Sequence, residues 1–386
     1  MIPRFKYAYN LRDAFKAVIS LTRSNESLPT SIQTLFPNSS PYFISSARLG
    51  IKHSLTAFKL KKGAKVGVQP YTCSSVLVAI KAAGYTPCFI DIDENLTLSI
   101  EDLSQKINEI DALIITHTFG FPAKIAQIKE IAENIPVIED CAHALFSEYQ
   151  QQQVGTFFDV SVFSFGNGKF PSLGAGGLLV VNNAKYIDGI EEQLGQLPKP
   201  SILQELKHIF STYFKALLHS KGVQKVLNKT FDDAFWDNRN KTPIAYEKRE
   251  YQIYKSTKSQ IAQKLIGFRQ QGWQQYENGH YLGAKVGSHY QFLEASNNFV
   301  NYFFFVILAD ERDKLYRYLR KNGIMAGKHF QHSLNWASTF GYQHGDCPIF
   351  EKQVDRILAI PCYYGLSKKD LAYIAHHVLV FKKATP

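Results

Sequence analysis

The sequence contains no apolar run that is long enough to cross a membrane. Its most apolar stretches, GLLVV at 177–181 and FFFVILA at 303–309, are far shorter than the ~20 residues that a spanning helix needs. The N-terminus, MIPRFKYAYNLRDAFKAV, is interrupted by charge every few residues and has no signal-peptide core. We therefore expect a cytoplasmic protein, and any contact with a membrane is expected to be peripheral.

The sequence also lacks paired cysteines. It has an odd number of them, with no CxxC pair and no zinc-type Cys/His spacing: Cys73, Cys88, Cys141, Cys347 and Cys362. Reduced thiols in a cytosolic protein are the simplest interpretation, and we predict no metal site. The hydrophobic content of 45% and the charged content of 20% are ordinary for a globular protein, which excludes disorder as the dominant state.

Net charge is the unusual property of this 386-residue chain, at +11. Residues 1–200 contain 18 basic and 18 acidic side chains, whereas residues 201–386 contain 26 basic and 15 acidic ones. The whole surplus is therefore C-terminal, which is compatible with binding to nucleic acid, to a membrane surface or to an anionic small molecule. Because no nucleic-acid-binding motif accompanies the charge, we expect no nucleic-acid partner.

Residues 43–182 alternate between predicted strands and predicted helices. The predicted strands are short β-rich or apolar runs at 63–69, 87–93, 111–118, 136–140, 160–165 and 177–181. Apolar strands with intervening helices are typical of an α/β fold with a mostly parallel sheet that is covered on both faces. Ligands of such sheets bind at the C-terminal ends of the strands, so we expect the functional residues there.

The rest of the chain has a different organisation. Residues 202–228 have the apolar spacing of an amphipathic helix with several lysines, which packs against the body or a second subunit, or lies on a membrane surface. From about residue 295 the pattern is that of a smaller α+β unit. We therefore predict a large domain over 1–184, a helical insertion or connector over 185–255, and a smaller C-terminal domain over 256–386.

The segment FSFGNGKFPSLGAGG, at 163–177, places Lys169 in a glycine-rich turn between two predicted strands. Taken alone, this residue is compatible with a surface lysine in a loop. The segment does not match a P-loop, because Phe163 occupies the first glycine position and Phe170 follows the lysine. It does not match a dinucleotide fingerprint either, because its glycines lead into a strand. A third interpretation is a lysine that forms a Schiff base with an aldehyde cofactor.

A pyridoxal phosphate site needs further groups, and the sequence offers a candidate for each. Asp140 ends the predicted strand PVIED and suits the carboxylate that keeps the pyridine nitrogen protonated, although it also suits a helix cap. His143 follows three residues later, where it would contact the ring or its phenolic oxygen. The SSAR segment at 45–48 precedes a helical stretch whose first amides would bind a phosphate, and Ser164 could add a hydroxyl.

Together these segments resemble the DegT/StrS family of sugar aminotransferases, which are pyridoxal phosphate enzymes of aminotransferase fold type I. SSARLGI resembles the family's SGTxAL phosphate loop, HTFGFPA its H-x-[YF]-G-x-P-A, and VIEDCAH its VIEDxAQ. VQPYTCSS and AAGYTPCFIDID resemble its strand-turn and the following AGATPVFVDID. VGTFFDVSVFSFGNGKFPSLGAGG resembles its lysine segment, VGxxxDxxxFSFxxxKxLGAGxGG. The resemblance is looser over 256–380, where HF at 329–330, DCPIFE and LAIPCYYGLS carry it.

The resemblance implies a role for each site residue. Lys169 would bond covalently to the cofactor and move the proton, and Asp140 would hold the pyridine nitrogen. His143 stands where the family usually has Gln. The phosphate would be held by Ala47, Arg48 and Ser164.

Several positions depart from the family's usual pattern or remain loosely matched. Ala47 replaces the glycine of the phosphate loop, which is tolerable where φ is negative. Cys73 stands where many members have an aromatic residue that stacks on the ring, and Tyr71 is the candidate substitute. His329 is a candidate substrate contact. The family's Asn that reaches the phosphate from a second subunit has no clear counterpart, and Asn238 and Asn240 are the candidates.

The resemblance also implies a homodimer and a reaction. Glutamate would donate the amino group to a keto-sugar, attached to a nucleotide, in the synthesis of a cell-surface polysaccharide or a secondary metabolite. Two alternatives stay open. One is a pyridoxal phosphate sugar enzyme that does not aminate, and the other is a basic membrane-surface or anion-binding protein on a catalytically inactive aminotransferase fold.

Overall fold

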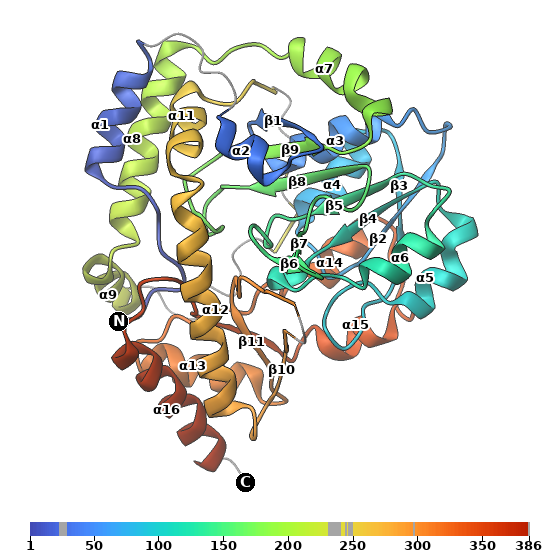
Figure 1. Ribbon diagram of the computed structural model, residues 1–386. Helices are drawn as coiled ribbons and strands as arrows, with labels where there is room; N and C mark the ends of the chain where they lie inside the picture. The colour runs from blue at the N-terminus through green and yellow to red at the C-terminus, as the bar shows by residue number, and fades with distance from the viewer. Residues whose placement is uncertain (23–28, 231–240, 244, 246–249, 296–297, 385–386) are drawn as a thin grey trace.

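The computed structural model describes residues 1–22, 29–230, 241–243, 245, 250–295 and 298–384 (Figure 1). A large sheet occupies one part of the molecule and a small sheet the other, with a long helix beside both. Among the described residues, no helix is both long enough and apolar enough to span a bilayer.

The large sheet has seven strands. The five central and outer strands β8, β5, β4, β2 and β3 run parallel, while β9 pairs antiparallel with both β8 and β1. The mostly parallel α/β sheet predicted from the sequence is therefore confirmed. Across the sheet, the strands are β1 (Ser40–Ile44), β9 (Gly177–Val181), β8 (Val160–Ser164), β5 (Val137–Asp140), β4 (Ala112–Thr116), β2 (Lys65–Val68) and β3 (Thr86–Phe89).

Helices cover both faces of this sheet, as the alternation of side chains along β4 shows. Leu113 and Ile115 belong to one apolar cluster, whereas Ala112 and Ile114 belong to another. Successive residues of a strand point to opposite faces, so each face has its own core. The helices around the sheet are α2 (Thr30–Leu35), α3 (Ala47–Ala57), α4 (Ser74–Ala82), α5 (Ile100–Lys106), α6 (Ile125–Ile131) and α7 (Ile187–Gly195).

A group of helices lies at one side of the large sheet. The predicted amphipathic segment at 202–228 forms two of them, α8 and α9, and α8 packs beside α1 and α11 (Figure 1). The sequence pattern did not indicate α1, which the side chain of Asn10 caps by accepting from the amide of Asp13. The helices are α1 (Leu11–Ser20), α8 (Ile202–Leu218), α9 (Lys221–Thr230), α11 (Lys255–Lys264) and the long α12 (Gly267–Val286).

The C-terminal unit is built on a small antiparallel sheet, in the order β10-β11-β12. The first residues of the chain lie against it, because Ile2 forms a parallel bridge with Ile324. The N-terminal segment therefore contributes to the C-terminal unit as well as to the large one. The elements are β10 (Gln291–Phe292), β11 (Phe305–Leu308), β12 (Ile357–Ile360), α13 (Arg312–Lys321), α14 (Ser333–Thr339), α15 (Pro348–Gln353) and α16 (Lys368–Ala384).

Candidate active site

A cavity of about 170 Å³ lies at the C-terminal ends of β4, β5 and β8. It contains seven of the nine candidate site residues that lie within the described part of the chain. Its lining is Ser46, Ala47, Arg48, Ile51, Thr72, Cys73, Ser75, Val76, Thr116, Asp140, Ala142, His143, Ser164, Lys169 and Phe330. A larger cavity of about 630 Å³, between β1, α8 and α11, contains none of the predicted site residues.

The N-terminus of α3 forms one wall of the cavity. Ser46 caps the helix, because its hydroxyl accepts from the amide of Leu49 at 3.3 Å. The amides of Ala47 and Arg48 belong to the first turn, for which the helix itself supplies no acceptor. Ser164 faces the same cavity from the end of β8. Two helix amides and a hydroxyl therefore suit an anion such as a phosphate.

Asp140 ends β5, and its Oδ1 atom accepts from the amide of Ala142 at 3.0 Å. Burial raises the pKa of this carboxyl, and the positive charge of Lys169 opposes that rise. A buried carboxylate with one backbone donor favours a further N–H partner in the cavity. Asp140 thus has the position and the chemistry to bind a protonated ring nitrogen.

Lys169 lies in the loop between β8 and β9, and its amide donates to Gly166 O at 3.1 Å. Burial lowers the pKa of Lys169, while Cys73 and Asp140 oppose that shift. The Nζ atom lies 5.7 Å from the centre of the Phe303 ring. An amine with a lowered pKa has a larger neutral fraction at pH 7, which is the form that attacks an aldehyde.

The ring of His143 is held between aromatic neighbours. It stacks on Phe303 with ring centres 4.3 Å apart and 19° between the planes. Its Nδ1 atom accepts from the amide of Phe119 at 3.3 Å, so in the neutral ring the proton lies on Nε2. Burial is the main reason why the pKa of His143 is well below its ordinary value. His143 therefore offers one fixed N–H donor.

The structure does not bring Tyr71 and His329 into the cavity lining. Tyr71 is fully buried behind it, and its hydroxyl donates to the carbonyl oxygen of His329 at 2.9 Å. Cys73 lines the cavity where the aromatic residue was expected. Tyr71 therefore ties the large unit to the C-terminal unit. Asn238 and Asn240 lie outside the described residues.

The cavity residues fit pyridoxal phosphate. Besides the lysine, the carboxylate and the anion-binding wall, two hydroxyl oxygens in the lining, Thr72 Oγ1 and Thr116 Oγ1, are buried without a hydrogen-bond partner. Buried polar atoms in native proteins nearly always have partners, so these two indicate a polar group that binds here. No sequence signal identified Thr72 or Thr116, because a threonine in a turn (Thr72) or at a strand end (Thr116) is ordinary in such a fold.

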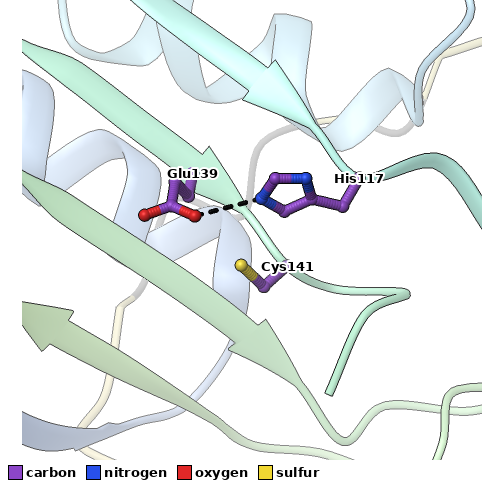
Figure 2. Close-up of side chains that lie close together, drawn as sticks. All are labelled: His117, Glu139 and Cys141. Carbon is purple, nitrogen blue, oxygen red and sulfur yellow. Dashed lines mark hydrogen bonds and ion pairs between the residues drawn. The ribbon is translucent and has the colours of Figure 1, made fainter. Parts of the chain in front are cut away.

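A second polar cluster brings His117, which follows β4, against Glu139 on β5 and Cys141 just after β5 (Figure 2). Glu139 accepts from His117 Nε2 at 3.0 Å and from the amides of Gly155, Phe157 and Phe158. Because His117 Nδ1 accepts from the amide of Ala123, its proton lies on Nε2. Both ring nitrogens are thus engaged. Cys141 completes the cluster, but burial raises the pKa of its thiol well above the ordinary value. We therefore interpret these three residues as a structural cluster and not as a set of metal ligands.

Residues 25–212 and 256–379 match the family model described as the DegT/DnrJ/EryC1/StrS aminotransferase family. The chain belongs to this family. It is a family of pyridoxal phosphate-dependent sugar aminotransferases, which agrees with the resemblance found in the sequence. The family match omits residues 213–255, which lie within the predicted insertion at 185–255.

Two relatives illustrate the range of the DegT family. The chain is 27% identical over 334 residues to UDP-N-acetyl-3-dehydro-alpha-D-glucosamine 3-aminotransferase of Acidithiobacillus ferrooxidans, across 83% of this chain and 79% of the relative. It is 38% identical over 149 residues to GDP-perosamine synthase of Escherichia coli O157:H7, across 38% of this chain and 41% of the relative. The second match thus spans less than half of the relative's length.

Solved structures of this family share the fold. Helicobacter pylori PseC, an aminotransferase involved in the biosynthesis of pseudoaminic acid, superposes with a TM-score of 0.76 at 15% identity, over 99% of both chains. The putative sugar aminotransferase Spr1654 from Streptococcus pneumoniae, in its PMP form, gives 0.78 at 16% identity over 100% of both. At these identities the likeness establishes the aminotransferase fold and leaves the substrate undetermined.

Proposed function

We propose that this protein is an aminotransferase that moves an amino group from glutamate to a keto-sugar carried on a nucleotide. The observation that carries the proposal is that Lys169, Asp140 and the N-terminus of α3 line one cavity at the strand ends. Membership of the DegT family supports the reaction class. Both relatives described above are named for nucleotide-linked sugars, which supports the acceptor class.

Pyridoxal phosphate would be held by the residues of this cavity. Its phosphate fits the amides of Ala47 and Arg48 and the hydroxyl of Ser164, and its ring nitrogen fits Asp140. When bound, the cofactor supplies an electron sink that stabilises negative charge on the carbon beside the amino group. Cys73 provides a small side chain against the ring in place of a stacking aromatic residue.

The chain's own residues manage the protons of the reaction. Lys169 Nζ takes the proton from the α-carbon of the amino donor and later returns a proton to the aminated sugar. The carboxylate of Asp140 holds a positive charge at the ring nitrogen, and the Nε2–H of His143 donates to an oxygen in the cavity. Retention of Lys169 argues against the DegT dehydratases, which lack the lysine and do not aminate.

Partner and pathway belong to the same proposal. We expect a homodimer, with the active site completed at the subunit interface, and a role in the synthesis of a cell-surface polysaccharide or a secondary metabolite. A competing function, a catalytically inactive fold that binds anionic surfaces, is not favoured by the cavity, because Lys169 and Asp140 are both present and close.

The test of this proposal uses purified protein and pyridoxal phosphate. We expect a visible absorbance band of lysine-bound cofactor that Lys169→Ala abolishes. Glutamate should then bleach the band, and a panel of nucleotide-linked keto-sugars should be searched by mass spectrometry for replacement of an oxygen by an amine. A protein without the band, or a band that survives Lys169→Ala, would contradict the proposal. The exposed variant Lys314→Gln is the matched control.

A further inference from the structure

Basic side chains outnumber acidic ones around the active-site cavity. Lys169, His143, His329 and Arg4 lie close enough for their charges to interact, and Asp140 is the carboxylate that faces Lys169. Lys169, His329 and Arg4 all add to the effect of burial in lowering the pKa of His143. Because burial keeps the pKa of both histidines well below its ordinary value, they are neutral at pH 7, and the cations of the group are Lys169 and Arg4. Asp140 is the one carboxylate named beside them, so the group favours an anionic ligand.

Arg4 is the member of this group that the cofactor chemistry does not use. Its Nη2 atom lies 2.7 Å from His329 Nδ1, and its guanidinium carbon lies 4.9 Å from the centre of the Phe304 ring. The Nε atom is buried without a hydrogen-bond partner. Burial lowers the pKa of Arg4 to about 10, and no carboxylate of the described residues pairs with it. By contrast, the buried Arg312 is bonded to both Asp313 and Asp355.

His329 offers a second donor at the same place. A guanidinium always donates, so Nδ1 of His329 accepts from Arg4 and the ring proton lies on Nε2. This Nε2 atom is also buried without a partner. The ring centre of His329 lies 4.1 Å from that of Phe330, which lines the cavity, and 5.2 Å from that of His143. Both Arg4 and His329 keep part of their surface exposed, so they border open space.

We propose that Arg4 and His329 bind a carboxylate of the amino donor. This inference rests on the proposed aminotransferase function. A guanidinium and a neighbouring imidazole N–H match a planar carboxylate, which they would bind with charge-assisted hydrogen bonds. The pair offers one Nε–H of Arg4 and one Nε2–H of His329 without partners, beside the rings of Phe304 and Phe330, which suits a single carboxylate better than the diphosphate of a nucleotide-linked sugar.

The stability of variants separates a ligand-binding role from a structural one. An arginine that holds the fold together loses favourable contacts when it is replaced. An unpaired buried cation instead costs free energy until its anion arrives. We therefore expect Arg4→Met to melt at or above the temperature of the wild type when no ligand is present. Ligands that bind the folded state raise its melting temperature, and the wild type should show this shift where Arg4→Met does not.

The experiment uses the protein prepared without cofactor, with glutarate as the probe, because glutarate is a dicarboxylate that lacks an amine. Calorimetry and melting should show glutarate binding that Arg4→Met weakens ~10–100-fold, with Arg4→Lys between the two. Arg317→Gln, an exposed arginine of the same C-terminal unit, is the matched control. Equal glutarate binding by wild type and Arg4→Met would overturn the inference. A structural role for Arg4 would be shown instead if Arg4→Met lost much of its stability while Arg4→Lys bound glutarate as tightly as the wild type.

The cofactor-loaded enzyme then identifies which carboxylate is bound. If Arg4→Met raises KM for glutamate and leaves KM for alanine unchanged, the pair binds the side-chain carboxylate; if both rise, it binds the α-carboxylate. A rise in KM for the sugar acceptor alone would overturn the inference, because the pair would then bind the acceptor. If the absorbance band of lysine-bound cofactor is absent, the proposed aminotransferase function is wrong. The glutarate experiment still tests Arg4 in that case, because it uses protein without cofactor.

A separate observation concerns the outer face of α1 and α8, which lie side by side at one edge of the molecule (Figure 1). Large apolar side chains are exposed along both helices, and on α8 they recur at helical spacing. Phe15 is 69% exposed and Leu203 is 73% exposed. The exposed apolar residues are Leu11, Phe15, Val18, Ile19, Ile202, Leu203, Phe210, Phe214 and Leu217. Large exposed apolar residues in this number on two packed helices mark an interaction surface.

The charges of α1 and α8 are divided between the two sides of the pair. The acidic residues are turned inward, where Asp13 pairs with Lys264 and Glu205 accepts from Ser256. The exposed charged residues on these two helices are all basic, namely Arg12, Lys16, Lys207 and Lys215. A two-fold contact of this face with itself would bring together two sets of cations and no exposed carboxylate of either helix pair. Anionic headgroups complement both the apolar residues and the cations.

We infer that the α1–α8 face binds the surface of an anionic lipid bilayer. The face is firmly joined to the active site, because Thr212 on the inner side of α8 packs within van der Waals reach of Gly174, in the loop that carries Lys169. Gly174 has a φ of +95°, and a Cβ atom there would lie 2.5 Å from Thr212 Cγ2. Docking of α8 would therefore hold the active site at a constant height above the bilayer.

The test is sedimentation of the intact protein with phosphatidylcholine vesicles that contain phosphatidylglycerol, compared with pure phosphatidylcholine. We expect binding to the anionic vesicles that falls with salt and that Phe210→Gln with Phe214→Gln weakens ~100-fold. Ile349→Gln with Tyr373→Gln, which removes two exposed apolar residues elsewhere, is the matched control. Absence of binding to anionic vesicles would overturn the inference, and so would a Phe210/Phe214 variant that turns a dimer into a monomer, because the face would then be a subunit interface.

Discussion

The two sides of the active site differ in how the chain builds them. The cofactor side comes from strand ends and one helix N-terminus of the large unit, between Ser46 and Lys169. The opposing side joins Arg4 to His329, which are 325 positions apart in the chain. The cofactor side has a carboxylate for its lysine, whereas no carboxylate among the described residues pairs with Arg4. Because the two sides come from different segments, substitutions around Arg4 and His329 can change the substrate without altering the residues that hold the cofactor.

The largest effect should come from the cofactor side. Lys169→Ala removes both the covalent attachment and the proton carrier, so amino transfer should fall by at least ~10³-fold, in the donor and acceptor half-reactions alike. Single-turnover kinetics of each half-reaction would measure this. If one half-reaction survived, the proton carrier would be another group and the division between the two sides would be wrong.

Asp140→Asn should follow in size. The amide cannot hold a positive charge on the ring nitrogen, so both half-reactions should slow by ~10²–10⁴-fold. Cofactor binding should persist, because the α3 amides still hold the phosphate. Equilibrium binding of pyridoxal phosphate, measured beside the rates, checks this. A variant that loses the cofactor but keeps its rate when saturated would assign Asp140 to binding alone.

Glu139→Gln tests whether the neighbouring carboxylate is structural. Its oxygens accept from three backbone amides and from His117, so the substitution should lower the free energy of unfolding by about 3 kcal/mol. The rate of amino transfer by the folded variant should change little. Urea unfolding gives the first quantity and steady-state kinetics the second. A large loss of rate at unchanged stability would instead show that Glu139 takes part in catalysis.

The smallest effect concerns stability and pH. Because the pKa of Lys169 is lower in the folded than in the unfolded state, the folded protein binds fewer protons, and the lysine destabilises it below that folded pKa. The penalty fades as pH rises towards the unfolded value of about 10.4. Lys169→Met should therefore raise the melting temperature of the cofactor-free protein at pH 7, and the gain should shrink at higher pH. A gain that stays constant from pH 7 to pH 10 would contradict this.

Sequence reasoning reached the cofactor side because its residues are local. Asp140 follows an apolar strand, Ser46 begins a helix, and Lys169 lies in a glycine turn, and in a parallel sheet such positions meet at one edge. The strands of the large sheet were predicted for the same reason, except β1, whose first four residues are only partly buried.

The Arg4 side could not be predicted in this way. Nothing in MIPRFK indicates that Arg4 lies beside His329, since the contact depends on the bridge between Ile2 and Ile324. Tyr71 was expected at the ring because it is aromatic and close to Cys73 in the sequence. The fold instead uses its hydroxyl to reach the C-terminal unit. Local patterns describe an element's own side chains, and contacts between distant segments require the folded chain.

The alternation at the end of β5 has a consequence for how this strand can evolve. Glu139 and Asp140 are adjacent, and one joins the backbone network while the other faces the cavity. A deletion or insertion of one residue within β5 would exchange the two carboxylates, and the fold and the chemistry would fail together. The pairing of β5 with β4 on one side and β8 on the other fixes the register twice. Insertions and deletions should therefore be tolerated in the loops that flank β5, whereas within the strand they should abolish both folding and activity.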